Sequence, residues 1–341
     1  MKKFQLRSIV GARRQKEDPA QVMGRFHKGA PLDEFSGRVI ADRYNITERI
    51  GIGGTSNVYL ALDNDTGEHV AVKVSHDQEK NRFISAETGV LKQVKHPNVV
   101  EIREEGTVDG RYFVVLEHLE IDLRKLLCRR EIEWGELQLI LTQVCNGLGA
   151  IHRAGLIHSD VKPQNIMITV RDGKEVAKLV DFGASIWTCD GPTYSTVAGT
   201  PQYMSPEQVS GKVDYRTDIY ALGIVMYEAM CGKVPFEGKS PLETAVKHMD
   251  EKPELPSRIR PGVLPEELEA IAMRALQKDP GDRFQTIGEM GMAISRCMKG
   301  FVAAWEEEIT RTTLELGQIA KTIFERKHPA HRTTELELPL N

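Results

Sequence analysis

Apolar and polar residues alternate over several short segments in the first third of the chain. Interrupted by Gly, Asn and Asp, this alternation predicts strands at Tyr44–Ile50, Asn57–Asp63, His69–Lys73 and Tyr112–Leu116. One stretch with helical periodicity, roughly Gln78–Val94, lies between the third and fourth strands and stops before His96-Pro97. Residues 44–118 are therefore expected to form a small strand-rich unit with one helix.

Beyond Asp122 the apolar positions recur with helical spacing. They predict helices over Glu136–Ala154, Asp218–Cys231, Pro241–Met249, Pro265–Leu276 and Ile287–Met298. No internal repeat or low-complexity tract interrupts them. We expect an α+β domain over residues 44–298, with a small N-terminal lobe at 44–118 and a larger helical C-terminal lobe at 119–298.

The two ends of the chain differ from this domain. Residues 1–40 hold nine Lys and Arg against four Asp and Glu, a balance of +5 with little apolar periodicity, which is typical of a flexible basic arm. Residues 301–327 carry apolar side chains at intervals of three and four, which predicts an amphipathic helix. Such a stripe more often packs on its own domain than on a coiled-coil or other partner. Residues 328–341 are expected to be a flexible tail.

Composition narrows the class of protein. The 45 Lys and Arg against 49 Asp and Glu give a net charge of −4, which argues against a dedicated nucleic-acid binder. Five cysteines without metal-binding or disulfide spacing suit free thiols in a reducing cytosol. The chain has no apolar signal-peptide core and no run near the ~20 apolar residues that span a bilayer. We expect a soluble, cytoplasmic protein without a transmembrane segment.

A glycine-rich stretch follows the first predicted strand and enters the second. Glycines allow backbone N–H groups to approach phosphate oxygens, which makes Gly51, Gly53, Gly54 and Ser56 candidate phosphate-binding positions. A plain hairpin turn would look similar. The position between two strands argues against a Rossmann or P-loop motif, in which the glycines precede a helix.

Lys73 lies in an apolar strand fifteen residues after Val58. In that place its ammonium group would face the cleft beneath the glycine stretch and could pair with phosphates, although a surface lysine on an edge strand is the simpler alternative. An ammonium group near phosphate needs a carboxylate to hold it. Glu87, in the middle of the predicted helix, is the preferred partner, and Glu79 near its start is the weaker candidate.

The strongest chemical signal is the run from His158 to Asn165, followed sixteen residues later by Asp181. Asp160 can accept the proton of an attacking hydroxyl, and Lys162 can neutralise charge on a transferred phosphoryl group. Asn165 and Asp181 supply the hard oxygen ligands that Mg²⁺ prefers. Each residue alone could be an ordinary loop or turn residue, but together at these spacings they predict phosphoryl transfer.

Gly51–Arg283 resembles a eukaryotic-type (Hanks-type) protein kinase domain. The stretches GIGGTSNVYLA, VKPQN and GTPQYMSPEQ are similar to the bacterial eukaryotic-like serine/threonine kinases. The resemblance implies a bilobal fold with an antiparallel sheet in the small lobe. It also implies ATP with Mg²⁺ or Mn²⁺, protein substrates, autophosphorylation, and self-association as an open alternative.

The resemblance also implies roles for further residues. The hinge that binds adenine through its backbone would be Glu117-His118-Leu119, with Leu116 as gatekeeper. The apolar walls around adenine would be Val58, Ala71 and Met167. A regulatory stack of side chains would run through Leu91, Ile102, His158 and Phe182, and Asp218 would anchor His158.

Beyond the catalytic run, the resemblance implies that Thr200 bonds Asp160 and Lys162, and that Glu207 pairs with Arg283. Lys162 and Thr200 together are typical of the serine/threonine branch of the family. Candidate phosphorylation sites in the activation loop are Thr193, Ser195 and Thr196.

Two positions depart from the family pattern. Ser56 replaces the third glycine of the loop, a small residue that is compatible with activity. Ser159 stands where most relatives have an arginine that binds an activation-loop phosphate. Without that guanidinium group, we expect activity to depend less on loop phosphorylation.

Two alternatives remain beside a protein kinase. A small-molecule kinase of the aminoglycoside or choline type shares the Asp160 and Asp181 positions, but it lacks a segment like Gly199–Glu207. A pseudokinase scaffold is the second alternative. The presence of Lys73, Asp160, Asn165 and Asp181 argues against it.

Overall fold

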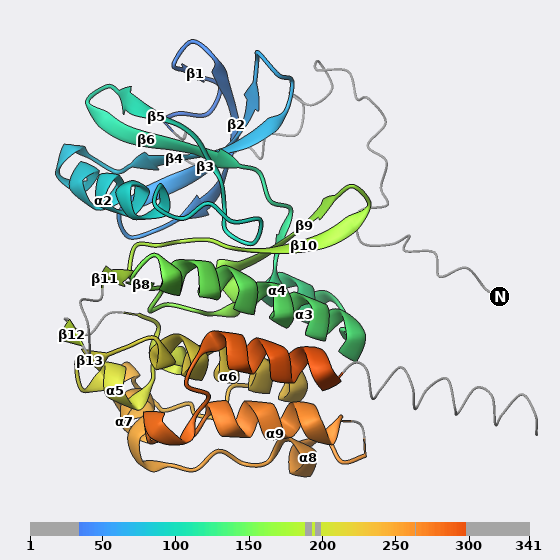
Figure 1. The fold of residues 1–341 in the computed structure, drawn as a ribbon. Coiled ribbons are helices and arrows are strands. Elements are labelled where there is room, and N and C mark those ends of the chain that lie inside the picture. Colours follow the sequence, from blue (N-terminus) through green and yellow to red (C-terminus); the bar gives the residue numbers. More distant parts are fainter. Residues whose placement is uncertain (1–33, 188–192, 195–198, 263, 298–341) are drawn as a thin grey trace, which may run out of the picture.

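The structure is a computed structural model that describes residues 34–187, 193–194, 199–262 and 264–297. The described chain forms two lobes stacked one above the other, with the sheet of the small lobe above the helices of the large lobe (Figure 1). The predicted α+β class with a bilobal arrangement is confirmed.

The small lobe contains one antiparallel six-stranded sheet with the order β1-β2-β3-β4-β6-β5. Its strands are β1 (Val39–Ile40), β2 (Tyr44–Ile52), β3 (Ser56–Asp63), β4 (His69–Ser75), β5 (Ile102–Val108) and β6 (Arg111–Glu117). The predicted helix over Gln78–Val94 is a 3₁₀ turn, η2 (Gln78–Lys80), followed by the α-helix α2 (Asn81–Leu91). The four expected strands are present, and β1 and β5 are additional.

Strand β5 escaped prediction because its sequence does not alternate between apolar and polar residues. Two of its half-buried positions are Glu104 and Gly106. A Cβ atom at position 106 would lie 2.9 Å from the ring of Phe113, the residue that pairs with Gly106 on β6. The ring thus fills the space that an apolar side chain would occupy at position 106, and only the two end residues of the strand, Ile102 and Val108, are apolar.

The predicted N-terminal arm extends too far into the domain. Phe35 and Ile40 are buried in the small-lobe core, where the Phe35 ring packs edge-on against Tyr59 at 5.8 Å between ring centroids. The Arg111 guanidinium lies over the Phe35 ring and pairs with Glu34 at 2.8 Å. Residues 34–40 therefore belong to the small lobe, and the preceding residues lie outside the described part of the chain.

The large lobe is mainly helical. Its helices are α3 (Leu123–Arg129), α4 (Trp134–Arg153), α5 (Pro206–Val209), α6 (Arg216–Cys231), α7 (Pro241–Asp250), α8 (Pro256–Ile259), α9 (Glu266–Ala275) and a helix over residues 287–297. Its short strands are β7 (Ile121–Asp122), β8 (Leu156–Ile157), β9 (Ile166–Arg171), β10 (Lys174–Leu179), β11 (Ile186–Trp187), β12 (Thr193–Tyr194) and β13 (Lys212–Val213). The 3₁₀ turns are η3 (Pro163–Asn165), η4 (Pro201–Tyr203) and η5 (Pro280–Asp282).

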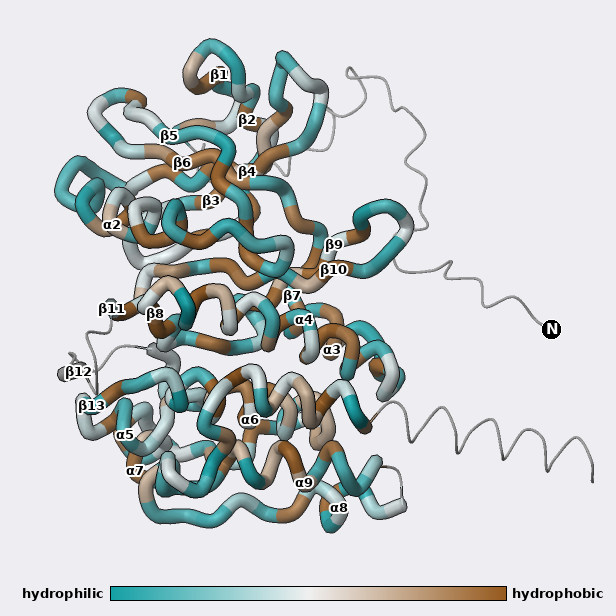
Figure 2. Tube along the Cα trace, viewed as in Figure 1, coloured by the Kyte–Doolittle hydropathy of each residue, from teal (hydrophilic) through white to brown (hydrophobic). Residues whose placement is uncertain are grey.

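Helix α6 is the centre of the large lobe, and thirteen of its sixteen residues are buried. A helix that is apolar around most of its circumference is stable only when other elements surround it. At Gly223 a Cβ atom would lie 2.8 Å from the Cβ of Ala275, so glycine allows α6 and α9 to pack closely. In Figure 2 apolar residues concentrate in α6 and in the central strands of the small lobe, β4 and β6.

The sequence led us to expect no transmembrane segment and free cysteine thiols, and both expectations can be compared with the described residues. Within them, no helix is both long enough and apolar enough to cross a lipid bilayer. The cysteines among them, Cys128, Cys145, Cys231 and Cys297, are all free thiols. Burial raises the pKa of the Cys145 thiol to about 12, which keeps it protonated and unreactive near neutral pH.

His248 on α7 gives the fold a dependence on pH. Its side chain is fully buried, and its Nδ1 lies 2.9 Å from the Tyr220 hydroxyl. Burial, with a smaller contribution from the positive charge of Lys278, lowers the pKa of His248 from 6.5 to about 4. Between these two values only the unfolded chain binds the proton, so acidification favours unfolding.

We therefore expect the free energy of unfolding to fall by about 2 kcal/mol between pH 7 and pH 5 because of His248 alone. The replacement His248→Gln should remove that part of the pH dependence in urea unfolding curves. The matched control is His69→Gln at an exposed histidine, which should keep the wild-type slope. Equal slopes for H248Q and wild type would contradict this assignment.

Candidate active site

Lys73 and Glu87 form an ion pair between the sheet and helix α2 of the small lobe. The Lys73 Nζ atom donates to both carboxylate oxygens of Glu87, at 2.6 and 2.7 Å, and both side chains are 13% exposed. Strand β4 holds Lys73 opposite Val58 of β3 and Val114 of β6. Glu87, rather than Glu79, is the partner of Lys73, and α2 is thereby fixed against the sheet.

The glycine-rich stretch is the turn of the β2–β3 hairpin. Gly51 pairs with Val58, and the Gly53 N–H donates to the Ser56 carbonyl at 2.8 Å. A Cβ atom at Gly54 would meet nothing, so the fold itself does not require glycine there. Ser56 is buried in the hairpin. An open backbone at Gly54 suits the predicted approach of phosphate, which remains a prediction.

The Asp160 carboxylate is held by hydrogen bonds to both of its oxygens. Its Oδ1 accepts from the Thr200 backbone N–H at 3.0 Å and from the Thr200 hydroxyl at 2.9 Å. Its Oδ2 accepts from Lys162 Nζ at 2.6 Å and from Asn165 Nδ2 at 3.2 Å. Lys162 also donates to the Thr200 hydroxyl at 2.8 Å. The three residues predicted to act together, Asp160, Lys162 and Thr200, are thus in direct contact.

Asn165 and Asp181 are the two residues predicted to bind a metal ion. Asn165 donates through Nδ2 to the backbone carbonyl of Asp160 at 2.9 Å, which leaves its Oδ1 as an acceptor. The Asp181 carboxylate is half exposed, and its Oδ1 lies 4.0 Å from Lys73 Nζ. One amide and one carboxylate oxygen suit a Mg²⁺ ion that also keeps waters and phosphate oxygens as ligands. The donor set therefore fits the predicted metal.

The predicted adenine site lies where the two lobes join. Ala71 on β4 pairs with Leu116 on β6, and Met167 on β9 pairs with Asp122 of β7. Leu116 and Met167 pack against the large-lobe core. Leu119 follows β6 and is buried. The Glu117 N–H donates to the Glu101 carbonyl at 3.1 Å, so this backbone donor is already used within the protein.

Asp218 on α6 fixes the backbone before Asp160. Its carboxylate accepts the N–H groups of His158 and Ser159, each at 2.9 Å, and the Nε2 of His152 lies 2.8 Å away. Burial alone would raise the pKa of Asp218. The hydrogen bond from His152 and the neighbouring backbone donors outweigh burial and hold the pKa below its ordinary value.

The predicted regulatory stack is assembled in one core. Leu91, His158 and Phe182 are buried, and Ile102 packs against the same cluster. The rings of His158 and Phe182 lie 5.1 Å apart between centroids. Phe182 is therefore packed inside the molecule, and Asp181 next to it faces Lys73.

The sequence pattern did not indicate an ion pair beneath the hinge. The Lys178 Nζ on β10 lies 2.6 Å from the Glu117 carboxylate, and both side chains are almost fully buried. Arg171 on β9 also approaches Glu117, at 3.3 Å. The pair joins the end of β6 to the strand that leads to Asp181. An isolated lysine three residues before Asp181 was the only signal in the sequence.

A second group that the sequence did not indicate joins three elements of the large lobe. Arg124 on α3 donates to Glu228 on α6 and to the Tyr203 hydroxyl, which itself donates to Glu228 at 2.6 Å. Burial and the hydrogen bond to Glu228 raise the pKa of Tyr203 above its ordinary value. The segment that follows Thr200 is thereby fastened to the lobe core.

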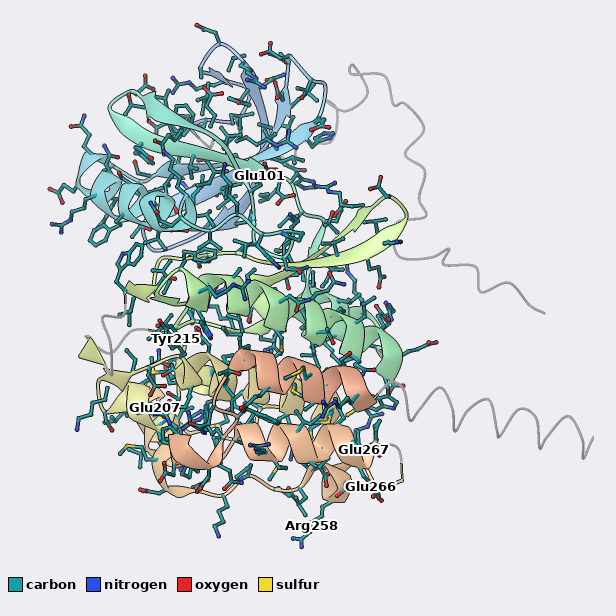
Figure 3. All side chains as sticks on the ribbon, in the orientation of Figure 1. Glu101, Glu207, Tyr215, Arg258, Glu266 and Glu267 are labelled. Atoms are coloured by element: carbon teal, nitrogen blue, oxygen red, sulfur yellow. The ribbon has the colours of Figure 1, made fainter. Side chains whose placement is uncertain are left out.

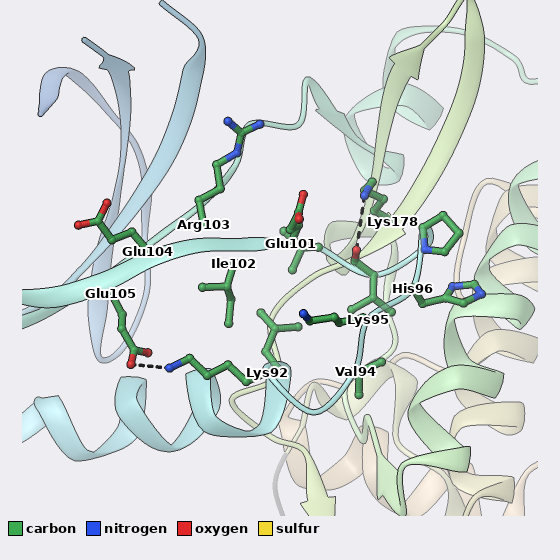
Figure 4. A pocket seen from close by; sticks show the side chains of 14 residues that line it. Lys92, Val94, Lys95, His96, Glu101, Ile102, Arg103, Glu104, Glu105 and Lys178 are labelled. Carbon is green, nitrogen blue, oxygen red and sulfur yellow. Dashed lines mark hydrogen bonds and ion pairs between the residues drawn. The ribbon is translucent and has the colours of Figure 1, made fainter. Parts of the chain in front are cut away.

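A hollow of about 580 Å³ lies behind the hinge, between the end of α2, the following loop and β5 (Figure 4). Its lining includes apolar side chains, the basic residues Lys92, Lys95, Arg103 and Lys178, and the acidic residues Glu101, Glu104 and Glu105. None of the residues predicted to bind ATP, to hold metal or to act in catalysis lines this hollow. It is therefore distinct from the predicted nucleotide site.

Some predictions cannot be compared with the structure. Ser195, Thr196 and residues 301–341 lie outside the described part of the chain, as do residues 1–33. Thr193 lies in β12, whose backbone pairs with β13, but its side chain is not described.

Glu207 and Arg283 form the second predicted pair. Figure 3 labels Glu207, which lies in the large lobe. Arg283 donates to both Glu207 oxygens, at 2.7 and 2.8 Å, and its side chain is 0% exposed. It also donates to backbone carbonyls, among them that of Arg216 at 3.1 Å. Removing the carboxylate partner of a buried guanidinium group lowers the stability of the fold strongly, because the remaining charge is neither hydrated nor paired.

We expect Glu207→Gln to lower the free energy of unfolding by about 3 kcal/mol, because it leaves the Arg283 charge buried and uncompensated. Glu68→Gln is the matched control, since Glu68 forms a solvent-exposed pair with Arg103 at 2.7 Å. The control should cost less than about 1 kcal/mol. Chemical denaturation measures both, and equal losses would show that burial does not decide the effect.

Comparison with known proteins places the chain in a family. Residues 44–292 match the model of the protein kinase domain. The chain is 37% identical over 265 residues to a probable serine/threonine-protein kinase of Clostridium perfringens, covering 74% of this chain and 38% of that protein. It is 38% identical over 284 residues to the probable serine/threonine-protein kinase PknB of Corynebacterium glutamicum, covering 78% and 44%.

The serine/threonine-protein kinase PknB of Mycobacterium tuberculosis is 34% identical over 283 residues, covering 76% of this chain and 44% of that protein. The chain thus spans less than half the length of these relatives. The match over residues 44–292 covers all the polar groups described above, from Lys73 to Arg283. The chain therefore belongs to the protein kinase family, and its relatives are bacterial serine/threonine kinases of the Hanks type.

Proposed function

We propose that this chain is an active serine/threonine protein kinase that moves the γ-phosphoryl group of ATP onto hydroxyl groups of other proteins. The observation that carries the proposal is the arrangement around Asp160, whose two carboxylate oxygens accept hydrogen bonds from Lys162, Asn165 and Thr200. A carboxylate fixed in this way can orient a hydroxyl nucleophile and take its proton.

In the proposed reaction the substrate hydroxyl oxygen forms a bond to the γ-phosphorus. The bond from that phosphorus to the bridging oxygen breaks, and the hydroxyl proton passes to Asp160. Lys162, 2.6 Å from the base, spreads the negative charge of the phosphoryl group. Catalysis here is mostly positioning and electrostatic stabilisation, for which a fixed set of charges is well suited.

Lys73 would hold the α- and β-phosphates, and Glu87 would keep its ammonium group in place. Asn165 and Asp181 would bind Mg²⁺, which neutralises phosphate charge. Mn²⁺ accepts the same oxygen ligands and is proposed as a substitute. The backbone of the β2–β3 turn, at Gly51, Gly53 and Gly54, would cover the phosphates.

The choice of serine and threonine follows from Lys162 and Thr200. Their mutual contact at 2.8 Å and their joint contact with Asp160 build the serine/threonine type of site. Autophosphorylation and a weakened dependence on activation-loop phosphorylation are part of the proposal. Self-association stays a prediction.

The catalytic proposal is tested with purified protein, Mg-ATP and a generic basic protein substrate. Lys73→Met and Asp160→Asn should each lower phosphate transfer by about 100-fold or more, since each removes a group that acts on the reacting atoms. Lys174→Met, at the exposed start of β10, and Asp172→Asn, at an exposed position of the β9–β10 turn, are matched controls and should keep wild-type activity.

Three results would contradict this proposal. Wild-type protein that binds ATP but transfers no phosphate would indicate a binding scaffold. Phosphate found only on a small metabolite would favour a small-molecule kinase. Variants K73M and D160N with wild-type rates would remove the proposed roles of both residues.

The regulatory part of the proposal is tested by replacing Thr193, Ser195 and Thr196 together with alanine. Activity should fall by less than about 10-fold, because Ser159 offers no guanidinium group for a loop phosphate. The rate of phosphate transfer, compared before and after phosphatase treatment of wild type, measures the same dependence. Complete loss of activity in the triple variant would mean that another cation binds the loop phosphate.

A further inference from the structure

Ser159, the residue before the catalytic Asp160, is held on both sides by hydrogen bonds. Its N–H donates to Asp218 Oδ1 at 2.9 Å, and its carbonyl accepts from Gln208 Nε2 at 2.8 Å. The residue has a φ of +65°, in the left-handed region that costs a non-glycine residue about 1–2 kcal/mol. This backbone conformation therefore depends on the bonds that hold it.

Gln208 uses both ends of its side-chain amide. Its Nε2 donates to the Ser159 carbonyl, while its Oε1 accepts from the Ser205 N–H at 3.4 Å. The Gln208 N–H in turn donates to the Ser205 hydroxyl at 3.3 Å, which completes a capping box at the start of α5. Ser205 and Gln208 are buried. One neutral amide thus joins the first turn of α5 to the catalytic loop.

Gly199 leaves the space in which this hydrogen bond forms. A Cβ atom at position 199 would lie 2.9 Å from Gln208 Nε2 and 3.0 Å from the Ser159 carbonyl oxygen. Gly199 also has a φ of +120°, which other residues rarely adopt. Thr200 follows at once and binds the Asp160 side chain. The segment of residues 199–208 therefore contacts the Asp160 side chain through Thr200 and the Ser159 carbonyl through Gln208.

We propose that Gln208 is a positioning residue for the phosphoryl-transfer reaction. Its amide fixes the backbone before Asp160 whenever the segment of residues 199–208 is in the position seen in this structure. The link is uncharged, and it needs no phosphate on the activation loop. Ser159, whose buried Oγ has no hydrogen-bond partner among the described residues, contributes no charge to it. This inference rests on the proposed kinase activity.

The decisive variant is Gln208→Glu. Glutamate keeps the length of the side chain and the capping-box acceptor, but a carboxylate replaces the donor that faces the Ser159 carbonyl. We expect kcat at pH 8 to fall by about 10- to 100-fold, the loss typical of a catalytic group displaced by about 1 Å. The KM for ATP should stay within about 2-fold, because the proposed phosphate-binding groups are unchanged.

The pH profile separates a positioning role from a merely structural one. A protonated carboxyl has an O–H group that can donate to the Ser159 carbonyl, and burial raises the pKa of a carboxyl group. The ratio of kcat for Q208E to kcat for wild type should therefore rise as the pH falls from 8 to 6. Gln208→Met fills the space without any donor, so it should lose kcat with no recovery at low pH.

Gln138→Glu is the matched control. Gln138 on α4 is also buried, and its Nε2 also donates to a backbone carbonyl, that of Ile294. This variant should lose thermal stability but keep kcat when it is assayed well below its unfolding temperature. Thermal unfolding of every variant is recorded beside the kinetics.

Four outcomes decide the inference. An active wild type with an equally active Q208E overturns it, as does a loss of kcat in Q138E that matches the loss in Q208E. If Q208E does not fold, Q208M decides, and full kcat in that variant overturns the inference. A wild type that transfers no phosphate overturns the proposed function, and this inference with it.

Discussion

The buried carboxylate of Asp218 is the interaction on which the catalytic loop depends. Helix α6 places this group inside the large lobe, where it accepts the N–H groups of His158 and Ser159 and contacts His152. A buried carboxylate is stable only when hydrogen bonds replace its lost hydration. Three donors form these hydrogen bonds with Asp218. If the loop moved away, the buried Asp218 carboxylate would lose its hydrogen bonds, and this cost keeps the neighbouring Asp160 in a fixed position.

The segment of residues 199–208 is connected to the same core by several independent groups. Tyr203 is tied to Glu228, another residue of α6, and the carboxylate of Glu207 is tied to a buried arginine. Thr200 and Gln208 then contact the catalytic loop from this fixed segment. The segment of residues 199–208 and the proposed base Asp160 are thus joined by hydrogen bonds, and their relative position is set by folding.

In the small lobe and at the hinge, two ion pairs hold the elements of the site together. Lys73 and Glu87 join its sheet to α2, and Lys178 and Glu117 join the hinge to the strand that leads to Asp181. Both are ion pairs with little exposure, so breaking either one leaves a poorly hydrated charge. Such pairs favour one arrangement of the elements that they join, which suits the phosphate-binding and metal-binding roles that we propose for residues on the two lobes.

The charged residues with a proposed chemical role could be predicted because that chemistry requires such groups at fixed spacing. Lys73, Asp160 and Asp181 carry that signal, and the fold brings Lys73 close to Asp181 and Lys162 close to Asp160. The contacts of two neutral residues, Phe35 and Gln208, could not be predicted. Phe35 is one of three phenylalanines in the basic stretch of residues 1–40, yet its burial brings residues 34–40 into the small lobe. The Gln208 amide donates to the Ser159 carbonyl, and only the structure shows this contact. A hydrogen bond between a side-chain amide and a backbone carbonyl leaves no pattern in the sequence.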